Sequence, residues 1–202
     1  MTAENNQKDI GHFDRWSRTY DASWIQRYIV RVHQDMLDVV SGMVSAPQSI
    51  LDVGCGTGQL LMKAGTRWPS ARLEGVDPAP GMVEIARRQA GGATFSLGNA
   101  ESLPMADSSV DVAFSSLSFH HWADQAKGLR EMSRVLRPGG CVCIADVTAP
   151  DWLASIVRRV RVRGSSGMAR LFTEAGLKVT LQRHSATRFV LLTFGVTMAG
   201  GA

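Results

Sequence analysis

Apolar residues recur at steps of three and four between Phe13 and Met43, which predicts an amphipathic helix over this segment. The pair Ala46-Pro47 predicts the end of that helix, because the residue before a proline disfavours helical backbone. The apolar positions are Trp24, Ile25, Tyr28, Ile29, Val32, Met36, Leu37 and Val40.

From residue 49 onward, short apolar runs alternate with helical stretches. Strands are predicted at 49–54, 71–77, 93–98, 110–116 and 141–147, and helices at 60–68, 81–90 and 124–136. This alternation is typical of a mostly parallel sheet that helices cover on both faces. Two more helical segments, around 151–163 and 167–175, precede strands predicted at 177–184 and 187–194. Since only two residues join these last strands, we expect them to pair as an antiparallel hairpin.

A glycine-rich turn, ILDVGCGTGQ at 50–59, follows the first predicted strand. Gly54, Gly56 and Gly58 can adopt positive φ and let a ligand approach the backbone closely. The helix beyond the turn presents unpaired N–H groups, which suit an anionic group. A tight strand–helix turn that binds nothing would have the same glycines, so the turn alone leaves both readings open.

Two acids near this turn narrow the choice of ligand. Asp77 ends the second predicted strand about 20 residues after the loop, where a carboxylate can accept hydrogen bonds from both ribose hydroxyls. It could equally cap the helix at 81–90. Asp52 would be poorly placed beside a pyrophosphate but well placed beside an α-amino group or a sulfonium. Because the loop also lacks the GxGxxG spacing, NAD is disfavoured.

Composition and charge exclude several classes of protein. The 202 residues include three scattered cysteines, which indicate neither a disulfide framework nor a zinc site, and a cytoplasmic location is expected. We find no apolar stretch of signal-peptide length and expect no membrane span. The net charge of +4 is uneven, because residues 151–202 hold eight basic but only two acidic side chains. Such a basic end is a candidate contact for anionic partners.

Five motifs occur in order between residues 51 and 140. They are LDVGCGTGQ at 51–59, GVDPAPGM at 75–82, GNAESLPMADSSVDVAFSS at 98–116, SFHHWAD at 118–124 and EMSRVLRPGG at 131–140. Together they resemble the class I S-adenosylmethionine-dependent methyltransferases. FDRWSRTYD at 13–21 is similar to the entry segment of the small-molecule branch, which includes quinone-biosynthesis methyltransferases. The resemblance implies a Rossmann-like, doubly wound α/β fold whose seven-stranded sheet is mostly parallel, with an antiparallel last strand.

The resemblance also implies the cofactor S-adenosylmethionine, the product S-adenosylhomocysteine, and no metal. The residues that would surround the amino-acid part of the cofactor are Asp52, Gly54, Cys55, Gly56 and Gly58. Those at the ribose and adenine would be Asp77, Pro78, Met82, Asn99 and Ala100, and those at the methionine end Ser115, Ser116 and, from the N-terminal helix, Tyr20. The family usually has an acid where this chain has Asn99, whose amide oxygen accepts without a charge-assisted bond.

His120 and His121 follow the fourth predicted strand and are the candidates for catalysis. A base is needed only if the methyl acceptor keeps a proton at the working pH, and imidazole suits that role near neutrality. The alternative is structural: one histidine caps the helix at 124–136 and the other packs beside Trp122.

The basic stretch IVRRVRVRG at 156–164 has three readings. Its arginines between Arg158 and Arg163 could form a solvated helix face, recognise an acidic small molecule or a membrane headgroup, or bind RNA. Nucleic acid is disfavoured, because no binding module is appended and no aromatic residues are interleaved with these arginines.

We therefore expect a single methyltransferase domain over 1–202 that acts on a small-molecule acceptor. Its parts would be an N-terminal helical cap (1–47), a cofactor-binding core (48–147), and C-terminal helices with a β-hairpin (148–202). The alternatives are a nucleic-acid or protein methyltransferase that uses the basic end, and a non-catalytic cofactor-binding protein. The short link from Val147 to Leu177 leaves little to cover the pocket, so either a homodimer closes it or a bulky acceptor fills it.

Overall fold

The computed structural model describes residues 10–11, 14, 21, 26–150, 161–186 and 188–197. Its helices are α2 (Gln26–Met43), α3 (Gln59–Arg67), α4 (Pro80–Gln89), the short 3-10 helix η1 (Phe119–His121), α5 (Gln125–Val135) and α7 (Ser165–Glu174). Its strands are β1 (Ser49–Val53), β2 (Arg72–Asp77), β3 (Ala93–Leu97), β4 (Val110–Ser116), β5 (Leu136–Val147), β6 (Leu177–His184) and β7 (Val190–Thr197).

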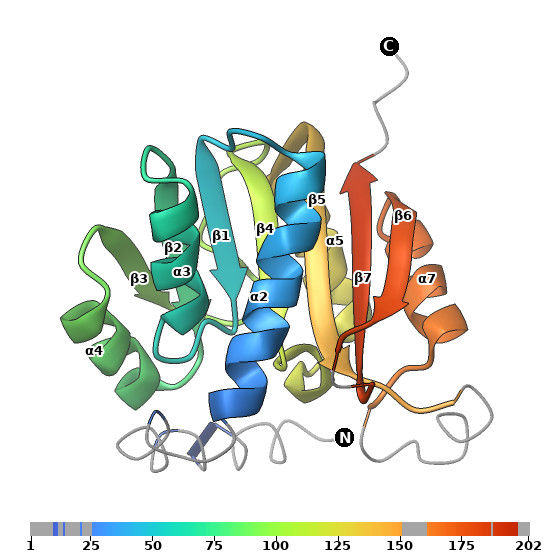
Figure 1. The fold of residues 1–202 in the computed structure, drawn as a ribbon, viewed down its shortest axis with the longest axis horizontal. Coiled ribbons are helices and arrows are strands. Elements are labelled where there is room, and N and C mark those ends of the chain that lie inside the picture. The colour runs from blue at the N-terminus through green and yellow to red at the C-terminus, as the bar shows by residue number, and fades with distance from the viewer. Residues whose placement is uncertain are drawn as a thin grey trace.

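The strands form one seven-stranded sheet in the order β3-β2-β1-β4-β5-β7-β6 (Figure 1). The pairs among β1 to β5 are parallel, whereas β7 runs antiparallel to both β5 and β6. This confirms the predicted α/β fold with an antiparallel C-terminal strand. The strand order changes direction at β1 and β4, and open α/β sheets bind ligands beyond the carboxyl ends of their strands at such a point.

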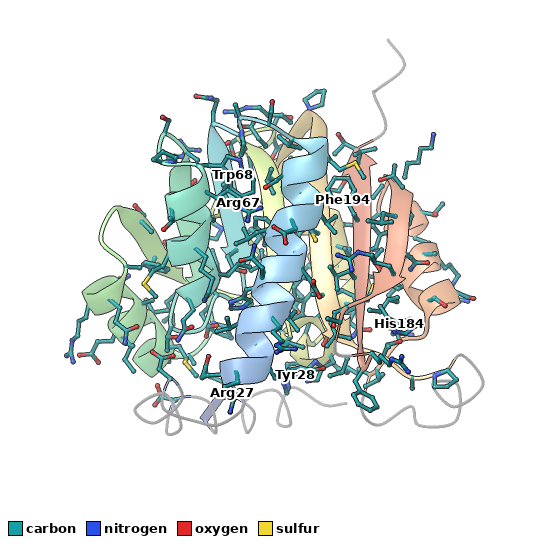
Figure 2. All side chains as sticks on the ribbon, viewed as in Figure 1. Arg27, Tyr28, Arg67, Trp68, His184 and Phe194 are labelled. Atoms are coloured by element: carbon teal, nitrogen blue, oxygen red, sulfur yellow. The ribbon has the colours of Figure 1, made fainter. Side chains whose placement is uncertain are left out.

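Helices cover both faces of the sheet (Figure 1). One apolar cluster packs α2, α3 and α4 against one face, and Figure 2 shows one of its members, Phe194 of β7, beside α2. The other cluster packs α5 and α7 against the opposite face, through residues such as Leu129 and Phe172. Each fully buried side chain of this size contributes about 1.5–3 kcal/mol. No helix among the described residues combines the length and the apolar character that crossing a bilayer requires.

The C-terminal part differs from its sequence-based prediction in two places. The last strand begins at Val190 rather than at 187, because the chain turns first: the N–H of Arg188 donates to the carbonyl of Ser185 at 3.0 Å, and Arg188 has φ 61°. Residues 161–164 are not helical, although a helix was expected around 151–163. Residues 151–160 lie outside the described part of the chain.

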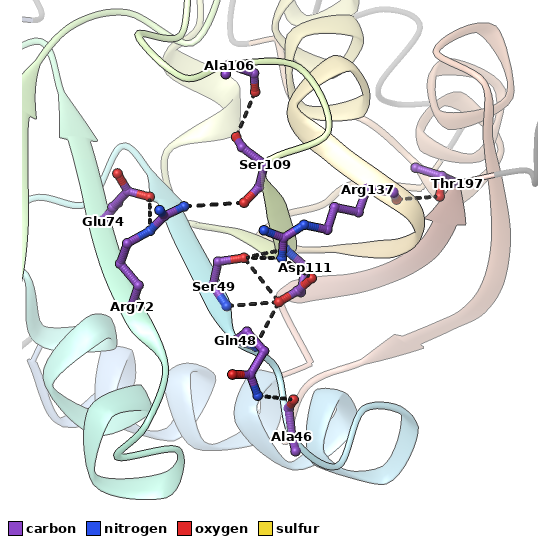
Figure 3. A network of polar contacts seen from close by, with 10 residues as sticks. All are labelled: Ala46, Gln48, Ser49, Arg72, Glu74, Ala106, Ser109, Asp111, Arg137 and Thr197. Carbon is purple, nitrogen blue, oxygen red and sulfur yellow. Dashed lines mark hydrogen bonds and ion pairs between the residues drawn. The ribbon is translucent and has the colours of Figure 1, made fainter.

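A polar network ties the beginnings of three neighbouring strands together (Figure 3). The carboxylate of Asp111 in β4 accepts hydrogen bonds from the N–H groups of Gln48 and Ser49, at 2.7 and 2.9 Å, and from Arg137 of β5 at 2.6 Å. Although burial opposes ionisation, these bonds lower the pKa of Asp111. The network fixes the alignment of β1, β4 and β5 at the sheet edge opposite their carboxyl ends.

Candidate active site

Two adjoining cavities open at the carboxyl ends of β1, β2 and β4. The larger encloses about 780 Å³, part of it open to solvent, and the smaller about 370 Å³. Both are lined by Gly54, Gly56, Ser116 and Leu117, so the glycine turn and the end of β4 lie where the cavities meet. A combined space of this size is typical of a site for a cofactor or a drug-sized ligand.

The glycine turn is shaped for close approach. Gly54 has φ 74°, and a Cβ atom there would lie 1.8 Å from Oγ of Ser118. Gly56 has φ 53°, and no atom lies within 4 Å of the position that its Cβ would take. Because Gly56 lines both cavities, the space that it leaves open belongs to them.

Asp77 ends β2 and joins the turn to the next helix. Its Oδ2 accepts from the N–H of Gly56 at 2.9 Å, and its Oδ1 accepts from the N–H of Ala79, also at 2.9 Å. Burial raises the pKa of Asp77, although both hydrogen bonds lower it. Asp77 is not the N-cap residue of α4, since that position belongs to Ala79. The carboxylate lines the larger cavity, where the resemblance expected a ribose.

Asp52 lines the smaller cavity and is 2% exposed. Burial, with a smaller contribution from the negative charge of Asp77, raises its pKa to about 8. No group among the described residues forms a hydrogen bond with its Oδ1. At neutral pH the side chain is therefore largely protonated, and a cationic ligand group beside it would favour the ionised form.

Three residues of α2 also line the smaller cavity: the apolar Ile29 and two polar residues that were not predicted for the site, Gln26 and His33. Burial and the nearby positive charge of Lys63 lower the pKa of His33 to about 3, so its imidazole is neutral. Its Nδ1 is buried and makes no hydrogen bond within the described part of the chain. The amphipathic pattern predicted that α2 packs on the sheet, but it could not show which polar side chains face the glycine turn.

The few described residues before α2 contact this site. The hydroxyl of Thr57 and the amide of Gln59 both donate to Oδ1 of Asp21 at 2.8 Å. The N–H of Gly81 donates to Asp14 at 2.6 Å, and Ile10 lines the larger cavity. Tyr20, predicted to close over the site, lies outside the described residues.

The larger cavity is also lined by the residues predicted for the adenine. They are Pro78, Met82, Asn99 and Ala100, accompanied by Glu101, Ser118, Trp122 and Ala123. The indole N–H of Trp122 donates to Oγ of Ser118 at 3.1 Å, which fixes the end of η1 against the turn after β4.

The structure thus brings most of the predicted site residues together, while a few lie beside the cavities. Asp52 and Cys55 line only the smaller cavity, and burial, with the charges of Asp77 and Asp52, raises the pKa of the Cys55 thiol. Gly58 is the N-cap residue of α3 and lies beside Phe95, and Ser115 is fully buried; neither lines either of the two cavities.

The two histidines of η1 have different surroundings. His121 lines the larger cavity, whereas His120 does not. Nδ1 of His120 lies 2.7 Å from Oδ1 of Asp146, a residue of β5 that the sequence analysis did not identify. The sequence alone could have pointed to Asp146, because it is an acid near the end of an apolar strand, and sheets of this kind bind ligands at that edge.

Comparisons with known proteins agree with this geometry. The sequence profile of the family described as "Methyltransferase domain" matches residues 51–144. A demethylmenaquinone methyltransferase of Thermus thermophilus is 33% identical over 176 residues, which cover 75% of this chain and 80% of that protein. A malonyl-[acyl-carrier protein] O-methyltransferase of Dechloromonas aromatica is 41% identical over 137 residues, which cover 67% of this chain but 48%, about half, of that relative.

A solved structure supports the fold. One chain in the complex between the Haloferax volcanii Trm112 methyltransferase activator and a methyltransferase superposes with a TM-score of 0.79 at 22% identity, covering 92% of this chain and 97% of that one. The sequence matches, the strand order, and the glycine turn at the point where the strand order changes direction all indicate the same family. The chain therefore belongs to the class I S-adenosylmethionine-dependent methyltransferases.

Proposed function

We propose that this protein transfers a methyl group from S-adenosylmethionine to a small-molecule acceptor. The observation that carries the proposal is a group of buried polar atoms without hydrogen-bond partners among the described residues. They are Oδ1 of Asp52, Nδ1 of His33 and Oγ of Ser116, and all three residues line the smaller cavity. A buried polar group without a partner costs about 1–3 kcal/mol, so a ligand that supplies the missing bonds is favoured.

The amino-acid end of the cofactor fits this group. An α-ammonium has three N–H donors, and Asp52, neutral His33 and Ser116 offer acceptors of the matching kind. Gly56 leaves space for close approach, and Asp77 offers a carboxylate to ribose hydroxyls. We place the adenine between Met82 and Ala100, which both line the larger cavity.

Methyl transfer from a sulfonium requires few chemical groups from the protein itself. When bound, the cofactor supplies an electrophilic methyl group on a sulfonium, whose departure leaves a neutral thioether. The protein's task is to hold the acceptor in line with that methyl group, which can supply up to about 7–11 kcal/mol. Asp14 and Asp21, which accept hydrogen bonds from Gly81, Thr57 and Gln59, would help to shield this part of the site from water. Because the leaving group departs neutral, we also propose that no metal takes part, and EDTA should leave the rate unchanged.

Two observations favour a small acceptor over RNA or protein. One relative is named for demethylmenaquinone, and another for a malonyl group that an acyl-carrier protein bears, so both names specify a small chemical group as the part that is methylated. The basic stretch is partly engaged within the protein: Arg161 contacts the carbonyl of Trp122, and Nε of Arg163 donates to Oε1 of Gln125 at 2.7 Å. These contacts support a role in holding the segment against η1 and α5, while Arg158 and Arg159 lie outside the described residues.

The test is to incubate the protein with radiolabelled S-adenosylmethionine and either a low-mass or a macromolecular fraction of a bacterial extract. We expect label in the low-mass fraction and none in RNA or protein. The variant Asp52→Asn should lose this transfer, whereas Asp111→Asn, altered at the opposite sheet edge, should keep it. Label confined to RNA or protein would overturn the proposed acceptor class, and failure to bind S-adenosylhomocysteine would overturn the whole proposal.

A further inference from the structure

A buried carboxylate holds one of the two histidines of η1. Asp146 is 2% exposed, and its Oδ2 accepts from the backbone N–H of His120 at 2.6 Å. Its Oδ1 lies 2.7 Å from Nδ1 of His120 and accepts from the N–H of Val147 at 2.7 Å. Since this carboxylate serves as an acceptor throughout, Nδ1 of His120 carries the proton. The ring nitrogen that can take up another proton is then Nε2.

The pair lies beside the place where the two cavities meet. Ser116, which lines both cavities, pairs with Ala145 across β4 and β5, and Asp146 is the next residue along β5. The ring of His120 is centred 3.9 Å from the ring of His121, which lines the larger cavity. The side chain of His120 is 18% exposed, so it is not sealed in the core.

From this geometry we infer that Asp146 is a positioning residue that holds His120 as a general base, and that the acceptor atom carries a proton. The inference rests on the proposed function and narrows the acceptor to a hydroxyl or an amine, as opposed to a carboxylate. The O–H or N–H bond of the acceptor breaks, and its proton goes to Nε2 of His120. The acceptor's electron pair forms the bond to the methyl carbon, and the pair of the broken carbon–sulfur bond stays on sulfur.

A purely structural role explains only part of the arrangement. Accepting the N–H of His120 would fix the start of η1 with one oxygen, and a neutral amide could do that. The second oxygen contacts the imidazole itself, which orients the ring and favours its protonated form when a proton arrives. A carboxylate acceptor is already ionised near neutrality and would not need this base. Of the other titratable or charged groups in the described part of the chain, the ring of His121 packs against that of His120, and Arg161 contacts the carbonyl of Trp122, two residues further along the chain.

The first test reads the histidine directly and needs no acceptor. Long-range proton–nitrogen correlation spectra of the protein saturated with S-adenosylhomocysteine should show His120 protonated at Nδ1 and bare at Nε2. In Asp146→Asn the pKa of His120 should fall by about 1 or more. The matched control is Asp124→Asn, which alters an acid that caps α5 through the N–H of Lys127 and should leave that pKa unchanged. A wild-type His120 protonated at Nε2 and bare at Nδ1, or an equal pKa in Asp146→Asn, would overturn the inference.

The second test uses defined acceptors with radiolabelled S-adenosylmethionine: catechol, tyramine and, as the carboxylate probe, malonyl-N-acetylcysteamine. We expect label in catechol or tyramine, a kcat about 10²-fold lower in His120→Gln, and unchanged affinity for S-adenosylhomocysteine. Label only in the carboxylate probe, no label in either proton-bearing probe, or equal rates in His120→Gln would each contradict the inference. If S-adenosylhomocysteine binds normally in those cases, the proposed function stands and only the inference fails.

Discussion

Asp77 and Gly56 are joined by a hydrogen bond of 2.9 Å from the N–H of the glycine to Oδ2 of the carboxylate. The acid expected to hold the ribose therefore also holds the glycine turn. In Asp77→Asn the single amide oxygen can accept from only one of the N–H groups of Gly56 and Ala79, and the charge that would bind the ribose hydroxyls is lost. We expect affinity for S-adenosylhomocysteine to fall by about 1–3 kcal/mol in a folded variant.

Calorimetry with a second ligand tests whether Asp77 binds the ribose hydroxyls. An analogue that lacks the ribose 2′-hydroxyl should bind the wild type less tightly than S-adenosylhomocysteine does, and Asp77→Asn should bind the two nearly equally. An unchanged preference for the hydroxyl in Asp77→Asn would show that Asp77 only supports the turn.

Gly56 lies in the glycine turn, and Gly139, which lies outside that turn, offers a matched control for a substitution there. Both have positive φ, 53° and 79°, and a Cβ at either position meets no atom within 4 Å, yet only Gly56 lines the cavities. An alanine in this backbone conformation costs about 1–2 kcal/mol, so urea unfolding should show similar destabilisation for Gly56→Ala and Gly139→Ala. Only Gly56→Ala should lose affinity for S-adenosylhomocysteine. Equal affinities of the two variants would mean that the cavity beside Gly56 is not the cofactor site.

Asp52 should make the free protein less stable as pH rises. Its pKa is raised to about 8 by burial and by Asp77, whereas the unfolded chain releases this proton near pH 4. Between these values the unfolded state binds fewer protons than the folded state, so stability falls with pH by up to about 1.4 kcal/mol per pH unit. Urea unfolding of the wild type and Asp52→Asn at pH 5 and pH 8 isolates this contribution. The variant should gain stability relative to the wild type at pH 8, and a constant difference between the two proteins would refute the assignment.

Asp111 should behave in the opposite way. Although burial opposes ionisation, hydrogen bonds from Arg137, Gln48 and Ser49 lower its pKa, so its stabilisation is present above the unfolded value near pH 4 and is lost as pH falls through the folded value. Asp111→Asn should lose about 1–3 kcal/mol of unfolding free energy at pH 7 and little at pH 2. Because the network lies at the opposite sheet edge, binding of S-adenosylhomocysteine to the folded variant should be unchanged; weaker binding would link that edge to the site.

Local pattern was enough to predict the sheet and the glycine turn. The strands β1 and β4 at the centre of the sheet are mostly buried on both sides, and Gly54, Gly56 and Asp77 occur at the spacing expected of a glycine turn followed by an acid at the end of the next strand. The start of β7 was predicted too early, because residues after Ser185 look strand-like although the chain turns there. His33 and Asp146 could not be assigned, since their roles depend on contacts between elements distant in the sequence. A helical pattern shows that α2 is amphipathic, but only packing shows that His33 and Asp52 line the same cavity.

The proposed function places the amino-acid end of the cofactor beside Asp52. Calorimetric titration with S-adenosylhomocysteine at pH 7, in phosphate and in Tris, tests it most directly, because the two buffers differ in their enthalpy of protonation. We expect binding to release a proton from Asp52, so that the observed enthalpy differs between the buffers in the wild type and much less in Asp52→Asn. Absence of binding, or a buffer dependence that Asp52→Asn leaves unchanged, would contradict it.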